Sequence, residues 1–307
     1  MRWHELAATC GFVLAASTAN ALTVTAVDGN TDNGLSLVNA LLGSSSGLTV
    51  TGTSFTGSGV QSGTYSGFGS VGLPGTLADG IALSSGHVAA APLSNTSSAW
   101  DHGDAGLPVP QGLPGGSSDD ADLVALLLSK GNNQQVNDVN FLEFTFTVDD
   151  PAQNSVSASF VYGTEEYPDQ SVTDIFGFFV DGVNYAFFSD GSLINFDEGG
   201  PNEAFYNSNL GGGFNIEWDG LTSILKITGL LNTALTEHTI KIAIADTSDT
   251  SWDSAVYIAN LSGTSTGGGG GIGNPGDPSP VPVPAALPLA LGGLSALGLL
   301  RRRARKS

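Results

Sequence analysis

Alternation of apolar and polar residues with a period of two is the feature that most constrains the fold of this chain. In residues 141–148, Leu142, Phe144 and Phe146 share one face, while Glu143 and Thr145 lie on the other. A two-residue period places alternate side chains on opposite faces of a β-strand, so this segment predicts a half-buried strand. The same alternation, or a short apolar run, predicts further strands at residues 48–55, 80–83, 156–162, 175–180, 224–227, 240–244 and 255–261.

These strands follow one another through turns rich in Gly, Asn, Asp and Ser, with few helices between them. Such an order favours antiparallel pairing and an all-β fold, a β-sandwich or jelly-roll-like single domain with one or two short helices. Residues 175–180 are apolar on both faces, which predicts a central strand. The segment from Gly43 to Gly116, rich in Gly, Ser and Thr, is expected to form a looser half of the same domain.

Two segments predict helices that pack on the side of a sheet. The first covers residues 35–42 and ends at Gly43, because glycine is the usual helix stop. The second covers residues 119–129, with Ser118 or Asp119 as its N-cap.

The start of the chain predicts export. Residues 1–21 combine a cationic start, an apolar stretch and the small-x-small site Ala19-Asn20-Ala21, which is typical of a secretory signal peptide. The mature domain is then expected to cover residues 22–263. It contains no cysteine, because the single cysteine of the chain, Cys10, lies in the signal.

The end of the chain has three parts after a Gly/Pro/Ser-rich linker at residues 264–280. A proline motif at residues 281–286 precedes an apolar span at 285–300 and a basic end at 301–307. The motif consists of Val281, Pro282, Val283 and Pro284, and the basic end carries Arg301, Arg302, Arg303 and Arg305. Sixteen apolar residues form about 24 Å of helix, a marginal membrane span that flanking arginines support.

This tail, residues 281–307, resembles a PEP-CTERM sorting signal in a Val-Pro-x-Pro-Ala variant. The resemblance implies a precursor tethered to the inner membrane, cleavage by an exosortase-type protease, and a final place at the cell surface or outside the cell. A plain single-pass anchor is the alternative.

Charge excludes one class of partner. All but Glu5 of the 29 acidic residues lie in residues 22–300, against only Lys130, Lys226 and Lys241. A surface of this kind repels phosphate backbones, so nucleic acid is excluded as a partner. The acidic charge is expected either to be offset by bound divalent cations or to keep the protein soluble.

Several ordered motifs carry a family resemblance. They are Val161–Tyr167, Thr173–Phe179, Trp218–Thr222, Ile242–Asp246 and Trp252–Val256. With them the chain resembles the choice-of-anchor L domain over roughly residues 35–261. The resemblance implies an extracellular domain without an established reaction.

Acidic residues at strand ends predict a Ca²⁺ site, because Ca²⁺ takes six to eight oxygen ligands from flexible loops. The candidate ligands are Glu165, Glu166, Asp174, Asp246, Asp249 and Asp253. Adjacent strand residues face opposite ways, so at most one of the two glutamates should reach a given ion. Turn-capping acids are the alternative.

The predicted function is a non-enzymatic, calcium-stabilised adhesion or exopolysaccharide- or matrix-binding module, which partners polysaccharide or surface proteins. Trp100, Tyr167 and Tyr206 are the candidate glycan contacts, whereas Trp218 and Trp252 are expected to fill the core. One alternative is a secreted glycan hydrolase that uses Glu166 and Asp246 as paired carboxylates. Another is an inert structural matrix component.

Overall fold

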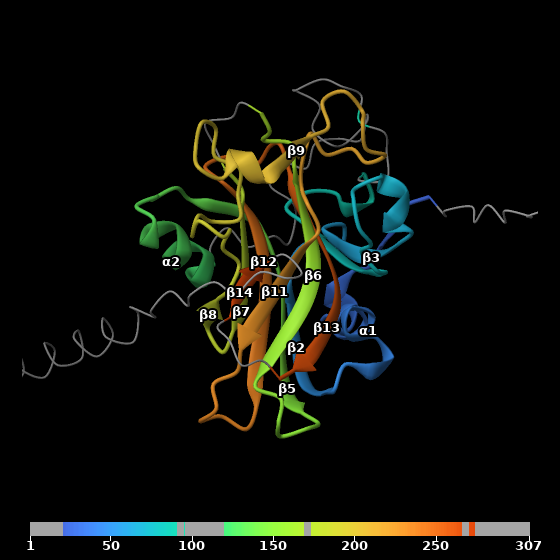
Figure 1. Ribbon diagram of the computed structural model, residues 1–307, viewed down its shortest axis with the longest axis vertical. Coiled ribbons are helices and arrows are strands. Elements are labelled where there is room, and N and C mark those ends of the chain that lie inside the picture. The colour runs from blue at the N-terminus through green and yellow to red at the C-terminus, as the bar shows by residue number, and fades with distance from the viewer. Residues whose placement is uncertain (1–20, 91–94, 96–119, 169–172, 266–269, 274–307) are drawn as a thin grey trace, which may run out of the picture.

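The protein is an antiparallel β-sandwich with two short helices, seen in a computed structural model that describes residues 21–90, 95, 120–168, 173–265 and 270–273. Figure 1 shows the two sheets face to face, with α1 (Leu35–Leu42) and α2 (Ala121–Ser129) on different sides. The strands of the described residues are β1 (Thr23–Ala26), β2 (Leu48–Thr56), β3 (Ser62–Ser66), β4 (Gly80–Ser84), β5 (Val136–Val148), β6 (Ser155–Thr164), β7 (Ile175–Val180), β8 (Val183–Asn184), β9 (Tyr206–Ser208), β10 (Gly220–Thr222), β11 (Leu225–Leu230), β12 (His238–Thr247), β13 (Ser254–Thr264) and β14 (Gly271–Gly273).

Every strand pair in the described part of the chain is antiparallel. One sheet has nine strands in the order β1-β3-β4-β13-β6-β10-β9, with β11 pairing with β6 and β14 with β11. The other has five strands in the order β2-β5-β12-β7-β8. This arrangement confirms the predicted all-β sandwich. The segment expected to be looser supplies β2 to one sheet and β3 and β4 to the other.

The main core lies between the sheets and is built from the apolar faces that the alternation predicted. Phe144 of β5, Phe160 of β6 and Ile242 of β12 are fully buried in it. Helix α1 begins and ends where the sequence predicted, and it adds Leu37 and Leu41 to the same core. Gly43 is its C-cap, with a left-handed φ of 63°.

Helix α2 covers the outer face of the five-stranded sheet. Its Leu123 and Leu127 pack against Ile175 and Phe179 of β7 and against Ala243 of β12. Strand β7 is therefore buried on both faces as predicted, but it lies next to the sheet edge rather than at the centre. It pairs with β12 on one side and with the two-residue β8 on the other, so the prediction of a central strand holds only in that β7 is not an edge strand.

The N-terminus of α2 also differs from the prediction. The helix begins at Ala121, and its cap is Asp120, whose Oδ1 accepts hydrogen bonds from the backbone N–H groups of Asp122 (3.1 Å) and Leu123 (3.0 Å). Asp120 has a second role that the sequence did not reveal. Its other oxygen accepts a hydrogen bond from Lys241 Nζ at 2.6 Å, which ties α2 to β12.

Apolar residues also cover the outer face of the nine-stranded sheet. Trp218 is 1% exposed there and donates a hydrogen bond from Nε1 to the hydroxyl of Tyr257 at 2.8 Å. Trp218 therefore fills a core, as expected, although it is the outer one. Trp252 is only half-buried.

The two ends of the chain are described only in part. Strand β14 lies inside the segment predicted to be a linker, and it extends the nine-stranded sheet through β11. No helix within the described ranges is long and apolar enough to cross a membrane. The predicted signal sequence up to residue 20 and the predicted sorting tail lie outside the described residues.

Candidate functional site

Strands β6 and β12 end at the same end of the sandwich, near the top of Figure 1, and buried polar residues lie in and just beyond their last positions. Strand β6 ends there at Thr164, which pairs with Ser254 at the start of β13. On the facing sheet, Ile175 at the start of β7 pairs with Ala245 near the end of β12. Two connections that are distant in sequence, from β6 to β7 and from β12 to β13, therefore meet at this end.

Strand parity decides which acids face the interior. Phe160 and Tyr162 of β6 belong to the core between the sheets, so Glu166, in phase with them, continues this face. By the same rule, Asp174 continues the interior face of β7 and Asp246 that of β12. Glu166 and Asp174 are each 1% exposed, and Asp246 is fully buried.

Hydroxyl groups join these segments. The Ser254 hydroxyl donates to Asp174 Oδ2, and Thr164 Oγ1 lies 2.8 Å from the same hydroxyl. Thr164 Oγ1 in turn accepts a hydrogen bond from the backbone N–H of Glu166 at 3.1 Å. Neither carboxylate oxygen of Glu166, nor Oδ1 of Asp174, accepts a hydrogen bond from any residue that the structure describes.

Burial and mutual repulsion raise the pKa values of these carboxyl groups. Burial, with the charges of Asp249 and Asp253, raises the pKa of Glu166 to about 9. The pKa of Asp174 is held well above its ordinary range by burial first, and then by Asp246 and Glu166. That of Asp246 is also well above its ordinary range, through burial and Asp253, although the nearby Ser85 hydroxyl opposes the shift.

We call Glu166, Asp174, Asp246, Asp249 and Asp253 the interior acidic cluster, of which Asp249 is exposed at the rim and the other four are buried. Five of the six acids predicted as ligands thus interact electrostatically with one another, and Asp253 is itself only 3% exposed. Without a cation, the raised pKa of Glu166 means that this buried carboxyl group holds its proton at neutral pH, and burial favours the protonated forms of Asp174 and Asp246 as well.

No basic side chain among the described residues compensates the cluster. Lys241 forms ion pairs with Asp120 and Asp122, which lie on the outer face of the five-stranded sheet, away from the cluster. Lys130 donates instead to the backbone oxygen of Gly191 at 2.7 Å. No described lysine therefore supplies a positive charge to the cluster.

The cluster is not a preformed metal cage. In the described ranges, no group of three or more His, Cys, Asp or Glu side chains already stands close enough to hold a metal ion. An ion would have to draw the carboxylates together or use hydroxyl, carbonyl and water oxygens as well. All of these are ligands that Ca²⁺ accepts, with six to eight oxygens at 2.3–2.6 Å in a flexible geometry.

The sixth predicted ligand, Glu165, faces the other way. It is 2% exposed and acts on the outer core, where its charge contributes to raising the pKa of Tyr257. Two more buried acids in the adjoining segment, Glu217 and Asp219, were missed in the sequence, and Asp219 Oδ1 accepts a hydrogen bond from Asn95 Nδ2 at 2.7 Å. Their only signal was their place beside Trp218 in a motif of the family resemblance.

The two predicted glycan contacts within the described residues, Tyr167 and Tyr206, lie close together but not on an open surface. Tyr167 and Tyr206 are half-buried and belong to an aromatic cluster with Phe196, with ring centroids 5.1–6.5 Å apart. The Tyr206 hydroxyl donates to the backbone oxygen of Asn195 at 2.7 Å. Trp100 lies outside the described residues. A sugar contact at these side chains stays a prediction.

Comparison with known protein families matches residues 23–264 to the choice-of-anchor L domain, which covers both sheets and the interior acidic cluster. Searches of curated proteins and of solved structures found no match. The family is not known for enzymatic activity, and its name refers to attachment at surfaces. On this match, which spans well over half of the sequence, the chain belongs to the choice-of-anchor L domain family and is a surface-associated protein.

Proposed function

We propose that this protein is a non-enzymatic surface binding module whose sandwich is stabilised by Ca²⁺ at the interior acidic cluster. The observation that carries the proposal is the burial of Glu166 with both carboxylate oxygens unbonded by the described residues, beside Asp174, Asp246 and Asp253. Buried carboxylates of one sign are costly unless they hold protons or meet a cation.

The position of the cluster supports a stabilising role for the ion. Its members come from the ends of β6 and β12 and from the segments before β7 and β13, which belong to two different sheets. An ion bound by them would link the sheets at the end where the apolar core stops. The mature domain has no cysteine, so no disulfide performs this task.

The burial of the same residues weighs against the glycan hydrolase. Glu166 and Asp246, the pair considered for catalysis, lie between the sheets with 1% and 0% exposure. A glycosidase must place its two carboxyl groups on either side of a bound sugar. A polysaccharide would have to part the two sheets to reach this pair.

The test is thermal unfolding of the purified chain in Ca²⁺, in Mg²⁺ and in chelator. At 100 times the Kd, a ligand that binds only the folded state adds about 2.7 kcal/mol, or roughly 5–10 °C for a domain of this size. We expect such a shift with Ca²⁺ and a smaller one with Mg²⁺, which demands stricter octahedral geometry. Equal unfolding temperatures in Ca²⁺ and chelator would contradict the proposal and leave an inert matrix component as the better description.

Two variants make the test specific. Glu166→Gln keeps the shape of the side chain but removes its charge, so we expect it to abolish most of the Ca²⁺ shift. Glu198→Gln makes the same chemical change at an exposed position with no role in the cluster, and it should keep the full shift. Loss of the shift in both variants, or in neither, would place the ion elsewhere.

The mode of attachment is a separate part of the proposal. We propose that residues 281–307 tether the precursor to the inner membrane and that an exosortase-type protease removes the tail near Val281–Pro284. Cell fractionation of the native host with antibody to the domain tests this. A shorter form outside the inner membrane supports processing, whereas a full-length form that stays in the membrane supports a plain anchor.

A further inference from the structure

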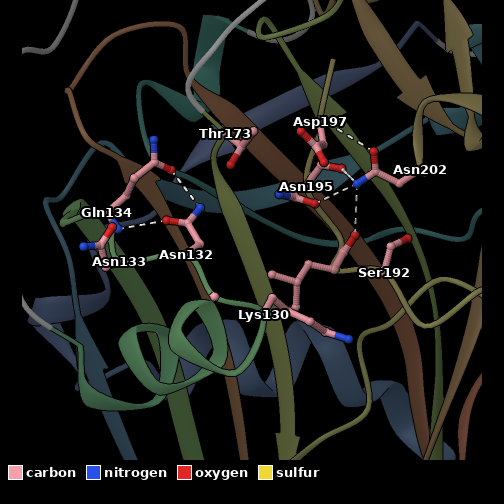
Figure 2. A pocket seen from close by; sticks show the side chains of 11 residues that line it. Lys130, Asn132, Asn133, Gln134, Thr173, Ser192, Asn195, Asp197 and Asn202 are labelled. Carbon is pink, nitrogen blue, oxygen red and sulfur yellow. Dashed lines mark hydrogen bonds between the residues drawn. The ribbon is translucent and has the colours of Figure 1, made fainter. Parts of the chain in front are cut away.

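A polar pocket lies beside the interior acidic cluster, in a place that the proposed Ca²⁺ site does not use. Its volume is about 530 Å³, within the range of about 300–1,000 Å³ found for small-molecule sites. One wall is the turn after α2, residues 130–134, and the other comes from residues 192–202 between β8 and β9. Figure 2 shows the amide side chains of the two walls on opposite sides of the space.

Asn195 presents a fixed hydrogen-bond donor in this pocket. Its side chain is only 8% exposed, and its Oδ1 accepts a hydrogen bond from Asn202 Nδ2 at 2.8 Å. Asn202 is held in turn by its bonds to the backbone oxygen of Asn195 (2.9 Å) and the backbone N–H of Asp197 (3.2 Å). The Asn195 Nδ2 group makes no hydrogen bond with the described residues, so a preorganised donor is left for a ligand.

The opposite wall offers further amide groups. Asn132 Nδ2 donates to Gln134 Oε1 at 2.9 Å, and the Gln134 backbone N–H donates to Asn132 Oδ1 at 2.8 Å. These bonds fix the turn and leave Gln134 Nε2 available. The neighbouring Asn133 is exposed, and its side chain makes no hydrogen bond with the described residues. Each free amide offers both donors and acceptors.

The chemistry of the lining defines the class of ligand. Leu193 is the one apolar side chain among the residues that line the described pocket, so an apolar ligand would gain little there. One lysine, Lys130, and one aspartate, Asp197, offset each other, so the pocket has no excess charge for an anion or a cation. The free donors of Asn195 and Gln134, with the donors and the acceptor of Asn133, match neighbouring sugar hydroxyls, which both accept and donate.

We infer that this pocket binds a neutral saccharide through the amides of Asn133, Gln134 and Asn195. The inference rests on the binding role proposed above and gives it a ligand class and a place. The pocket is also joined to the interior acidic cluster. The Thr247 hydroxyl, next to Asp246, lies 3.2 Å from Gln134 Oε1 and also contacts the backbone oxygen of Thr173, next to Asp174. Cation binding should therefore make the turn at residues 130–134 more rigid and increase the affinity for the sugar.

The test is isothermal titration calorimetry of the purified chain with maltose, cellobiose, lactose and di-N-acetylchitobiose, and with digalacturonate as a charged comparison. We expect at least one neutral disaccharide to bind. Asn195→Asp keeps the oxygen that accepts from Asn202 but removes the free donor, and it should weaken binding by roughly tenfold, the usual effect of one lost hydrogen bond. Asn133→Ala, at an exposed position, should weaken binding without affecting the fold.

The matched control is Asn260→Asp, the same change on the exposed part of β13, which should leave binding unchanged. The inference is overturned if none of the four neutral sugars binds more tightly than about 10 mM, if digalacturonate alone binds, or if neither Asn195→Asp nor Asn133→Ala weakens binding. The titrations are made in Ca²⁺ and in chelator, beside the thermal shift on the same sample. If Ca²⁺ raises the unfolding temperature but no sugar binds, only the saccharide pocket proposal is refuted. If a sugar binds but Ca²⁺ does not raise the unfolding temperature, only the Ca²⁺ site proposal is refuted.

Discussion

The raised pKa of Glu166 predicts an unusual dependence of stability on pH. When a chelator removes divalent cations, this carboxyl group holds its proton in the folded state up to about pH 9, whereas its ordinary value is 4.5. Between these two values the folded state binds more protons than the unfolded state, so stability is fully present below pH 4.5 and is lost as the pH rises towards 9. Carboxylates that form salt bridges give the opposite trend: their pKa values are lowered in the folded state, so stability falls as the pH falls.

The size of the effect follows from proton linkage. One such group contributes about 1.4 kcal/mol per pH unit, so the free energy of unfolding should fall by about 2 kcal/mol between pH 7.0 and 8.5. For a domain of this size that is a fall in Tm of roughly 4–8 °C. The interval is chosen because histidines and ordinary carboxyl groups titrate mainly below it. Asp174 and Asp246, whose pKa values are also raised, act in the same direction.

Differential scanning calorimetry across this interval, with and without Ca²⁺, measures the effect. Bound Ca²⁺ keeps the carboxylates ionised, so the fall should be much smaller when it is present. In chelator, Glu166→Gln should make the free energy of unfolding depend less steeply on pH, by the contribution of about one proton. The exposed Glu198→Gln should not change this dependence. The reasoning is refuted if Tm in chelator rises with pH, or if the wild type and Glu166→Gln have the same slope.

Three further substitutions test other contacts. Gly86→Ala would place a Cβ atom 1.7 Å from Asp253 Oδ2, so it should displace that carboxylate and reduce the Ca²⁺-induced Tm shift while far-ultraviolet circular dichroism retains the β signal. Lys241→Met leaves Asp120 buried without its cation and should lower the free energy of unfolding in urea by about 3 kcal/mol, a loss that an unchanged midpoint would contradict. Gly163→Ala would bring a Cβ atom to 2.6 Å from the Trp218 ring, and overpacking of this kind costs about 1–3 kcal/mol, measurable in the same urea titration.

The sequence predicts the interior of this fold better than its exterior. The alternation in β5, β6 and β12 identifies the faces that meet between the sheets, because a two-residue period is a local property. The covering of β7 by α2 depends on contacts between residues 123–127 and 175–179, and no local pattern reports it. For the same reason the salt bridge from Lys241 to the cap of α2 could not be predicted.

The candidate site shows the same division. Strand parity predicts that Glu165 and Glu166 point in opposite directions, and the structure places them in the outer and the interior environment respectively. The sequence also identifies the acids that end β12 and precede β7 as candidates. It does not predict that no described lysine reaches them, nor that Asn195 faces the turn after α2 across a pocket. Both facts follow from the packing of distant loops.

The distance along the chain between the members of the interior acidic cluster has a consequence for when the domain matures. Glu166 and Asp246 are eighty positions apart and follow or end strands of different sheets, so the cost of burying them together arises only where the two sheets close on each other. If the proposed Ca²⁺ site forms, a chain without the ion should close its two sheets less readily than a chain that binds it. The ion would then act on the closure of the two sheets as well as on the stability of the closed sandwich.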